Sequence, residues 1–157
     1  SYSSASMTKG LAGAACPARP RRAETPKFSG MPPPRKPGSR PAHILVAAAS
    51  DLAADACREP WALGREVAGE ILRWVVITAG AAGARARSQR ERLEVPAAPV
   101  RPVDTTGAGD AFAAGLLHAL LDGRSMPDAL ALAVRFGTEA TLWATSGLPA
   151  PAVRRLL

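Results

Sequence analysis

A glycine-rich turn that runs directly into a long apolar helical pattern most limits the folds open to this chain. The turn is Thr105–Gly109, and Asp104 and Asp110 stand on either side of it. Glycine adopts backbone angles and close approaches that other residues resist. The first turn of the helix that follows offers positive charge and amide groups, which favour phosphate. A carboxylate beside such a site predicts phosphoryl transfer, whereas the simpler interpretation of Asp110 is an acidic helix cap.

The strand pattern around this turn indicates a layered α/β fold. Two apolar runs, His43–Ala48 and Trp74–Thr78, predict short buried strands, and the second ends at a glycine turn. The arginine-rich stretch Ala84–Glu94 predicts an exposed hairpin or edge, and the proline-containing stretch Val95–Val103 predicts an extended connector. Strands that alternate with helices predict parallel strands flanked by helices.

Three helical segments accompany these strands. Helical spacing runs over residues 51–73, with a new helix expected at Pro60 because proline is tolerated in a first turn. A second helix starts at Asp110 and is capped by Gly123, and a third runs from Ser125 to about residue 144. The apolar stripe of the second helix consists of Ala111, Phe112, Leu116, Leu117, Leu120 and Leu121.

The positive charge of the chain is concentrated at its N-terminal end. The net charge is +7 over 157 residues, and residues 1–41 hold eight of the 20 Lys and Arg but only one of the 13 acids. The same residues hold eight of the 15 prolines, so we expect a disordered basic tail at 1–41 and a folded part at 42–157. Because the folded part is electrically balanced, nucleic acid binding is not expected. No apolar run is long enough for a membrane helix.

The nine residues Asp104–Phe112 resemble, without a gap, the second signature of the ribokinase-like (PfkB) carbohydrate kinases. In that family the last aspartate of the signature is the catalytic base, a role that the resemblance assigns to Asp110. The first aspartate and the third residue help to bind a monovalent cation in many members, which implies a K⁺ site at Asp104 and Thr106. The resemblance also places an anion hole on the backbone amides of Gly107, Ala108 and Gly109.

A second family element, a strand that ends in Thr-x-Gly-x-x-Gly and lines the nucleotide site, matches Thr78–Gly83. The resemblance thus implies nucleotide-binding roles for Thr78, Gly80 and Gly83. The carboxyl end of a strand is also where α/β folds open their ligand crevice. A plain strand-to-turn glycine pair is the alternative interpretation.

The sequence departs from the family pattern at three places. Ala48–Asp51 occupies the position of an Asn-x-x-Glu element that handles magnesium and phosphate, which leaves Asp51 as a candidate Mg²⁺ ligand without the asparagine amide. Arg135–Glu139 is bulkier and more charged than the small residues that line the family's adenine pocket. The resemblance covers about His43 to the end, and nothing in residues 1–42 resembles the family's N-terminal, sugar-binding half.

Together with the resemblance, these features predict a partial ribokinase-like three-layer fold and an ATP-dependent phosphotransferase. The acceptor would be a sugar or nucleoside hydroxyl, with ATP and Mg²⁺ required and K⁺ at the anion hole. The alternative is a truncated, non-catalytic remnant that binds nucleotide weakly or not at all. We also expect a cytoplasmic protein, no membrane partner, and self-association through an exposed sheet edge.

Overall fold

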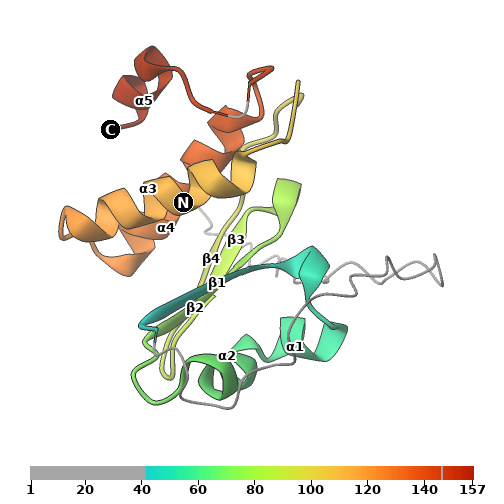
Figure 1. Ribbon diagram of the computed structural model, residues 1–157, viewed down its shortest axis with the longest axis vertical. Helices are drawn as coiled ribbons and strands as arrows, with labels where there is room; N and C mark the ends of the chain where they lie inside the picture. Colours follow the sequence, from blue (N-terminus) through green and yellow to red (C-terminus); the bar gives the residue numbers. More distant parts are fainter. Residues whose placement is uncertain (1–41, 146) are drawn as a thin grey trace, which may run out of the picture.

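A four-stranded sheet lies between two layers of helices in the computed structural model, which describes residues 42–145 and 147–157 (Figure 1). The predicted basic tail at 1–41 lies outside the described residues. The strands follow the chain in spatial order: β1 (Ile44–Ala48), β2 (Trp74–Thr78), β3 (Ala84–Arg87) and β4 (Arg92–Val95). The α/β layered fold predicted from the sequence is therefore confirmed.

The expected parallel pairing holds only between β1 and β2. The pairs β2–β3 and β3–β4 are antiparallel, because their connections are too short for the crossover that parallel neighbours need. The β3–β4 hairpin predicted for Ala84–Glu94 is present, and Ser88 closes its turn by accepting hydrogen bonds from the amides of Arg90 and Glu91 at 3.3 and 2.9 Å.

The strand predicted at His43–Ala48 is present as β1, but the prediction that it is buried is wrong. Within the described residues β1 pairs only with β2, so it forms an edge of the sheet. Val46, at the centre of β1, is 42% exposed, whereas Val75, Val76 and Ile77 of β2 are buried. Thus β2 alone has the burial expected of an inner strand, with its two faces covered by different helices.

The helices that follow β1 cover one face of the sheet. They are α1 (Ala54–Arg58) and α2 (Pro60–Ala68), preceded by a 3-10 turn, η1 (Ala49–Asp51). Pro60 starts α2 as predicted, but the helical segment ends at Ala68 rather than at residue 73. Val75 and Ile77 of β2 pack against this layer in one core cluster.

The other face of the sheet is covered by α3 (Ala108–Leu121) and α4 (Met126–Ala140), which pack against each other and, through α4, against β3 and β4 (Figure 1). The third predicted helix is too long, since α4 ends at Ala140, and a short helix that the sequence pattern did not indicate, α5 (Ala150–Leu156), follows it. The apolar stripe of α3 is only partly buried, because Leu117 and Leu121 are 58% and 88% exposed.

Tight contacts fix the α3–α4 pair. A Cβ on Gly115 of α3 would lie 2.9 Å from the ring of Phe136, so the missing side chain lets this ring pack directly on the α3 backbone. Beyond α3, the Arg124 amide donates to the Ala119 carbonyl and the Gly123 amide to the Leu120 carbonyl, a Schellman ending that confirms Gly123 as the predicted stop.

Candidate active site

The turn before α3 is held by its own hydrogen bonds. The Asp104 carboxylate accepts a 2.8 Å hydrogen bond from the Thr106 amide. Hydrogen bonds from Thr106, and to a smaller extent from the Thr105 amide, lower the pKa of Asp104. Gly107 then takes left-handed angles, with φ 78° and ψ −1°, and occupies the N-cap position of α3. Thus the aspartate shapes the turn and the glycine ends it.

The first turn of α3 presents amide groups that the helix itself cannot use. The first N–H groups of any α-helix lack intrahelical acceptors. Here the Ala108 amide donates to the Thr105 carbonyl at 3.2 Å, whereas the amides of Gly107, Gly109 and Asp110 have no hydrogen-bond acceptor among the described residues. Of the three amides predicted to form the anion hole, that of Ala108 is therefore engaged within the turn.

Asp110 lies in the first turn of α3 and is exposed. The simpler interpretation, in which Asp110 caps the helix, is wrong. Gly107 occupies the cap position, and no side chain makes a capping hydrogen bond. The carboxylate is consequently available, beside amides of the same turn, for chemistry at the helix N-terminus.

Residues at the end of α4 contact the turn before α3 and the first turn of α3. The amides of Val103 and Asp104 donate to the Thr141 carbonyl at 2.7 and 3.2 Å. A Cβ on Gly137 would lie 3.2 Å from the Ala108 carbonyl oxygen, so this glycine allows α4 to approach the first turn of α3 closely. Neither support was predicted from the sequence, although a glycine inside a strongly helical pattern is a signal of close packing.

The loop after β2 follows the strand as predicted, and backbone packing explains one of its two predicted glycines. Thr78 is the last residue of β2, and a 3-10 turn, η2 (Gly80–Ala82), follows it. Gly80 is exposed. Gly83 is buried, and a Cβ there would lie 2.1 Å from the Val95 carbonyl oxygen, so the backbone packing alone requires glycine. Backbone packing is thus one reason for glycine at position 83, and the nucleotide-binding roles of Thr78, Gly80 and Gly83 stay predictions.

The loop after β1 places Asp51 in the η1 turn. Its carboxylate is exposed and accepts a 3.1 Å hydrogen bond from the Ser50 hydroxyl. Among the described residues, no group of three or more His, Cys, Asp or Glu could hold a metal ion. Asp51 is therefore not part of a described cluster of three or more such residues.

The strand registers bring the loops after β1 and β2 and the connector after β4 to the same end of the strands. Ala48, Thr78, Ala84 and Val95 lie side by side across the four strands, so β1, β2 and β4 all end here. The connector from β4 then leads to the turn before α3 (Figure 1). Within the described part of the chain, no hydrogen bond joins this turn to the loops after β1 or β2.

Within Arg135–Glu139, the side chains of Phe136 and Glu139 contact neighbouring helices and the segment after α4. Phe136 is buried against Gly115, and the Glu139 carboxylate accepts hydrogen bonds from Trp143 Nε1 at 3.4 Å and from Arg155 Nη2 at 3.3 Å. Arg135 is exposed. This departure from the family's small residues therefore reflects the α3–α4–α5 contacts.

The sequence of the folded part identifies the family. Residues 42–152 match the family described as pfkB family carbohydrate kinase. The chain belongs to this family. Two similar proteins are inositol 3-kinase from Arabidopsis thaliana, 41% identical over 64 residues, and ribokinase from Bacillus subtilis (strain 168), 44% identical over 59 residues. The aligned segments cover 41% and 38% of this chain.

The pfkB fold is also found among solved structures. The aminoimidazole riboside kinase from Salmonella enterica, complexed with aminoimidazole riboside and an ATP analog, matches with a TM-score of 0.61 and 26% identity, over 74% of this chain. The match spans 42% of that kinase, and the curated matches span 18% and 20% of their proteins. Among the described helices, none is both long and apolar enough to cross a membrane.

Proposed function

We propose that this chain carries the phosphoryl-transfer end of an ATP-dependent kinase that acts on a sugar or nucleoside hydroxyl. The observation that carries the proposal is the N-terminus of α3, where amides that have no acceptor among the described residues share one helical turn with the exposed Asp110 carboxylate. Membership of the pfkB family supports the reaction class. The riboside ligand and ATP analog of the Salmonella enterica enzyme support the acceptor and donor classes.

The proposed mechanism gives each group of the turn one task. The amides of Gly107 and Gly109 hold the oxygens of the transferring phosphoryl group by preorganised dipoles. The hydroxyl oxygen of the acceptor forms a bond to the γ-phosphorus, and Asp110 accepts the proton that this hydroxyl loses. The bond from that phosphorus to the bridging oxygen breaks at the same time, and ADP leaves. The products are a phosphate ester and ADP, with the proton on Asp110.

Cations would assist this transfer. Asp51 is the carboxylate that we propose to hold Mg²⁺, which would neutralise charge on the phosphates. One carboxylate fits this role, because Mg²⁺ in kinases keeps several waters and is bound mainly through substrate phosphates. A K⁺ ion bound by Asp104 and Thr106 would support the turn, since the lowered pKa of Asp104 keeps that carboxylate charged.

A second candidate is a non-catalytic nucleotide-binding role. One observation favours it: the described residues hold no cluster of three or more ligands for a metal, and the Asn-x-x-Glu position carries Ala48–Asp51 instead. In this case the α3 turn would bind phosphate, and no acceptor would be phosphorylated.

The test is ADP release by the chain with ATP, Mg²⁺, K⁺ and a panel of sugars and nucleosides. We expect turnover on at least one acceptor, reduced roughly 10²–10⁴-fold by Asp110→Asn, the range for loss of a general base. Asp128→Asn is the matched control, because Asp128 is likewise an exposed acid in the first turn of a helix, α4. It should leave turnover nearly unchanged.

Three results separate the candidates. Turnover that falls with Asp110→Asn but not with Asp128→Asn supports the kinase. Nucleotide binding by calorimetry without turnover on any acceptor supports the second candidate. Equal activity of the Asp110→Asn variant and the unchanged chain would remove Asp110 from the mechanism.

A further inference from the structure

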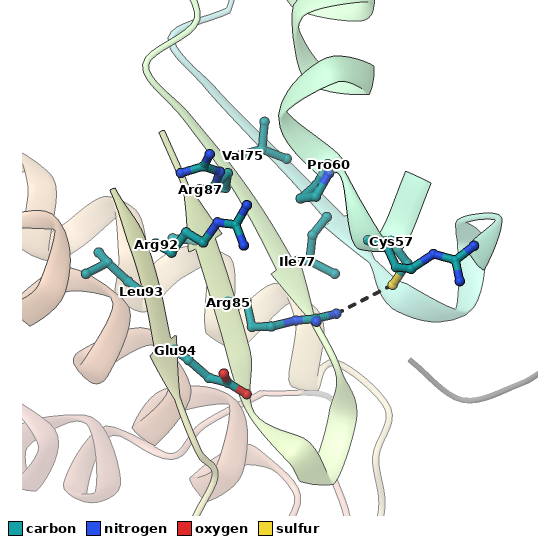
Figure 2. A pocket seen from close by; sticks show the side chains of 11 residues that line it. Cys57, Pro60, Val75, Ile77, Arg85, Arg87, Arg92, Leu93 and Glu94 are labelled. Carbon is teal, nitrogen blue, oxygen red and sulfur yellow. Dashed lines mark hydrogen bonds between the residues drawn. The ribbon is translucent and has the colours of Figure 1, made fainter. Parts of the chain in front are cut away.

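A hollow lies on the opposite face of the sheet from α3 and α4. It has a volume of about 280 Å³ and lies between the β3–β4 hairpin and the layer of α1 and α2 (Figure 2). The charged side chains that line it are Arg58, Arg85, Arg87, Arg92 and Glu94, and its apolar wall includes Pro60, Val75 and Ile77. None of the residues assigned to phosphoryl transfer lines this hollow.

Strand alternation separates the two sites. Side chains that are neighbours in a strand point to opposite faces of the sheet. Ala84 and Ala86 of β3 pack in the core beneath α3 and α4, so Arg85 and Arg87 project from the other face. On β4 the same alternation places Arg92 and Glu94 with them, and Glu94 is the acid among the residues that line the hollow. Figure 2 shows Arg85 and Arg92 pointing across the hollow toward α1 and α2.

The arginines of the hollow are poorly balanced by acids. Arg87 lies directly opposite Arg92 in the β3–β4 register, and like charges in that position destabilise a sheet. Within the described residues, Arg87 donates only to the Glu91 backbone carbonyl, at 3.2 Å. The carboxylate of Glu59 lies 3.9 Å from Arg92, and their side chains are 67% and 71% exposed.

Arg58 and Arg85 add further positive charge to the lining, and Arg85 has no ion pair within the described part of the chain. It lies opposite Glu94 in the register, yet its described hydrogen bond runs to the Cys57 sulfur at 3.5 Å rather than to that carboxylate. Arg85 and Arg87 are both half-buried, which limits the screening of their charges by water. A bound anion would relieve the repulsion between Arg87 and Arg92.

From this arrangement we propose that the hollow binds a small phosphate monoester. A phosphate monoester carries close to two negative charges at neutral pH, which matches the facing pair Arg87 and Arg92, and arginine binds phosphate oxygens through paired N–H groups. Pro60, which is half-buried, would contact the carbon skeleton of the ester, with the buried side chains of Val75 and Ile77 behind it. The volume falls near the lower end for ligand pockets, which favours a monoester over a nucleoside triphosphate.

The test is calorimetric titration of the full chain with phenyl phosphate, with phenyl sulfate as a probe of the same shape and only one charge. We expect phenyl phosphate to bind more tightly than phenyl sulfate. Arg87→Gln and Arg92→Gln should each weaken phenyl phosphate binding about tenfold, the loss expected for one charge-assisted hydrogen bond. Arg154→Gln, which removes an exposed charge on α5, is the matched control and should leave the affinity within about twofold.

Unfolding measurements without any anion separate binding from a structural role. Arg87→Gln should be as stable as the unchanged chain or more stable, because it removes the repulsion from Arg92. A marked loss of stability would assign this arginine to the sheet and overturn the proposal. No binding of phenyl phosphate, equal binding of phenyl sulfate, or an equal loss in Arg154→Gln would overturn it as well. None of these outcomes depends on kinase activity.

Discussion

Gly107 decides where α3 begins and how its first amides point. Its φ of 78° is a left-handed angle that costs other residues free energy, and it follows directly on the Thr106 amide held by Asp104. Gly109, two residues later, has ordinary helical angles and open space around its Cβ position. The backbone conformation therefore favours glycine at position 107, whereas it does not at position 109.

Replacement of each glycine by alanine tests this difference. Gly107→Ala should lower the free energy of unfolding by about 1–2 kcal/mol, because alanine resists the left-handed angle. Gly109→Ala should raise it by about 0.5–1 kcal/mol, because alanine loses less entropy in a helix. Urea unfolding followed by circular dichroism measures both. Equal effects of the two substitutions would contradict the proposed geometry of the turn.

The Asp104 carboxylate predicts a pH dependence of stability. Its pKa is lowered from the usual 3.8 by hydrogen bonds from Thr106 and Thr105, so it stabilises the fold while it is ionised. This contribution is present above the unfolded pKa and is lost as the pH falls through the lower folded pKa. Asp104→Asn should thus be less stable than the unchanged chain at pH 7, and the difference should shrink toward pH 3. A difference that is constant with pH would contradict the role of the ionised carboxylate.

At the scale of elements, the contact of α3 with α4 positions the site. Phe136 packs on the backbone at Gly115, and Gly137 sits against the first turn of α3. The end of α4 then holds the preceding connector through the Thr141 carbonyl. The N-terminus of α3 is consequently fixed from α4 as well as from its own turn.

A double-mutant cycle tests the fit between the two helices. Gly115→Ala places a methyl group about where the Phe136 ring lies and should destabilise the chain by about 1–3 kcal/mol. Phe136→Leu should cost less in the Gly115→Ala background than alone, with a coupling of at least about 0.5 kcal/mol. Additive effects in urea unfolding would mean that the ring and the glycine do not share one contact.

Local patterns predicted the elements that depend on local chemistry. The strand Trp74–Thr78, the start of α2 at Pro60 and the end of α3 at Gly123 follow from strand propensity, proline geometry and glycine caps. The end of α4 at Ala140 and the exposure of Leu117 depend on contacts between distant segments, which periodicity does not contain. The family of the site was predictable from nine adjacent residues, whereas its support by Thr141 was not.

At the scale of the whole molecule, the exposed edge at β1 is the main liability. Among the described residues, β1 has a partner on one side only, and Val46 at its centre is 42% exposed. An unpaired edge strand presents free N–H and C=O groups that can pair with another chain. We therefore propose that the chain self-associates through β1.

A charge on this strand should reduce the association. Val46→Lys should shift the chain toward monomer in sedimentation equilibrium over a range of concentrations, since lysine on an edge strand opposes pairing. Val67→Lys is the matched control, because Val67 is a 53% exposed valine on α2, away from the sheet edge. An equal shift with both variants, or none with Val46→Lys, would place the association elsewhere.

We propose that nucleotide phosphates bind at the N-terminus of α3. The most direct test is a titration of the ¹⁵N-labelled chain with Mg²⁺-ADP, followed by the amide signals in NMR spectra. We predict the largest shifts at Gly107, Gly109 and Asp110, whose amides lack acceptors among the described residues, and smaller shifts in the loop after β2. Amide signals of this turn that stay in place, at ADP concentrations that shift others, would contradict the claim.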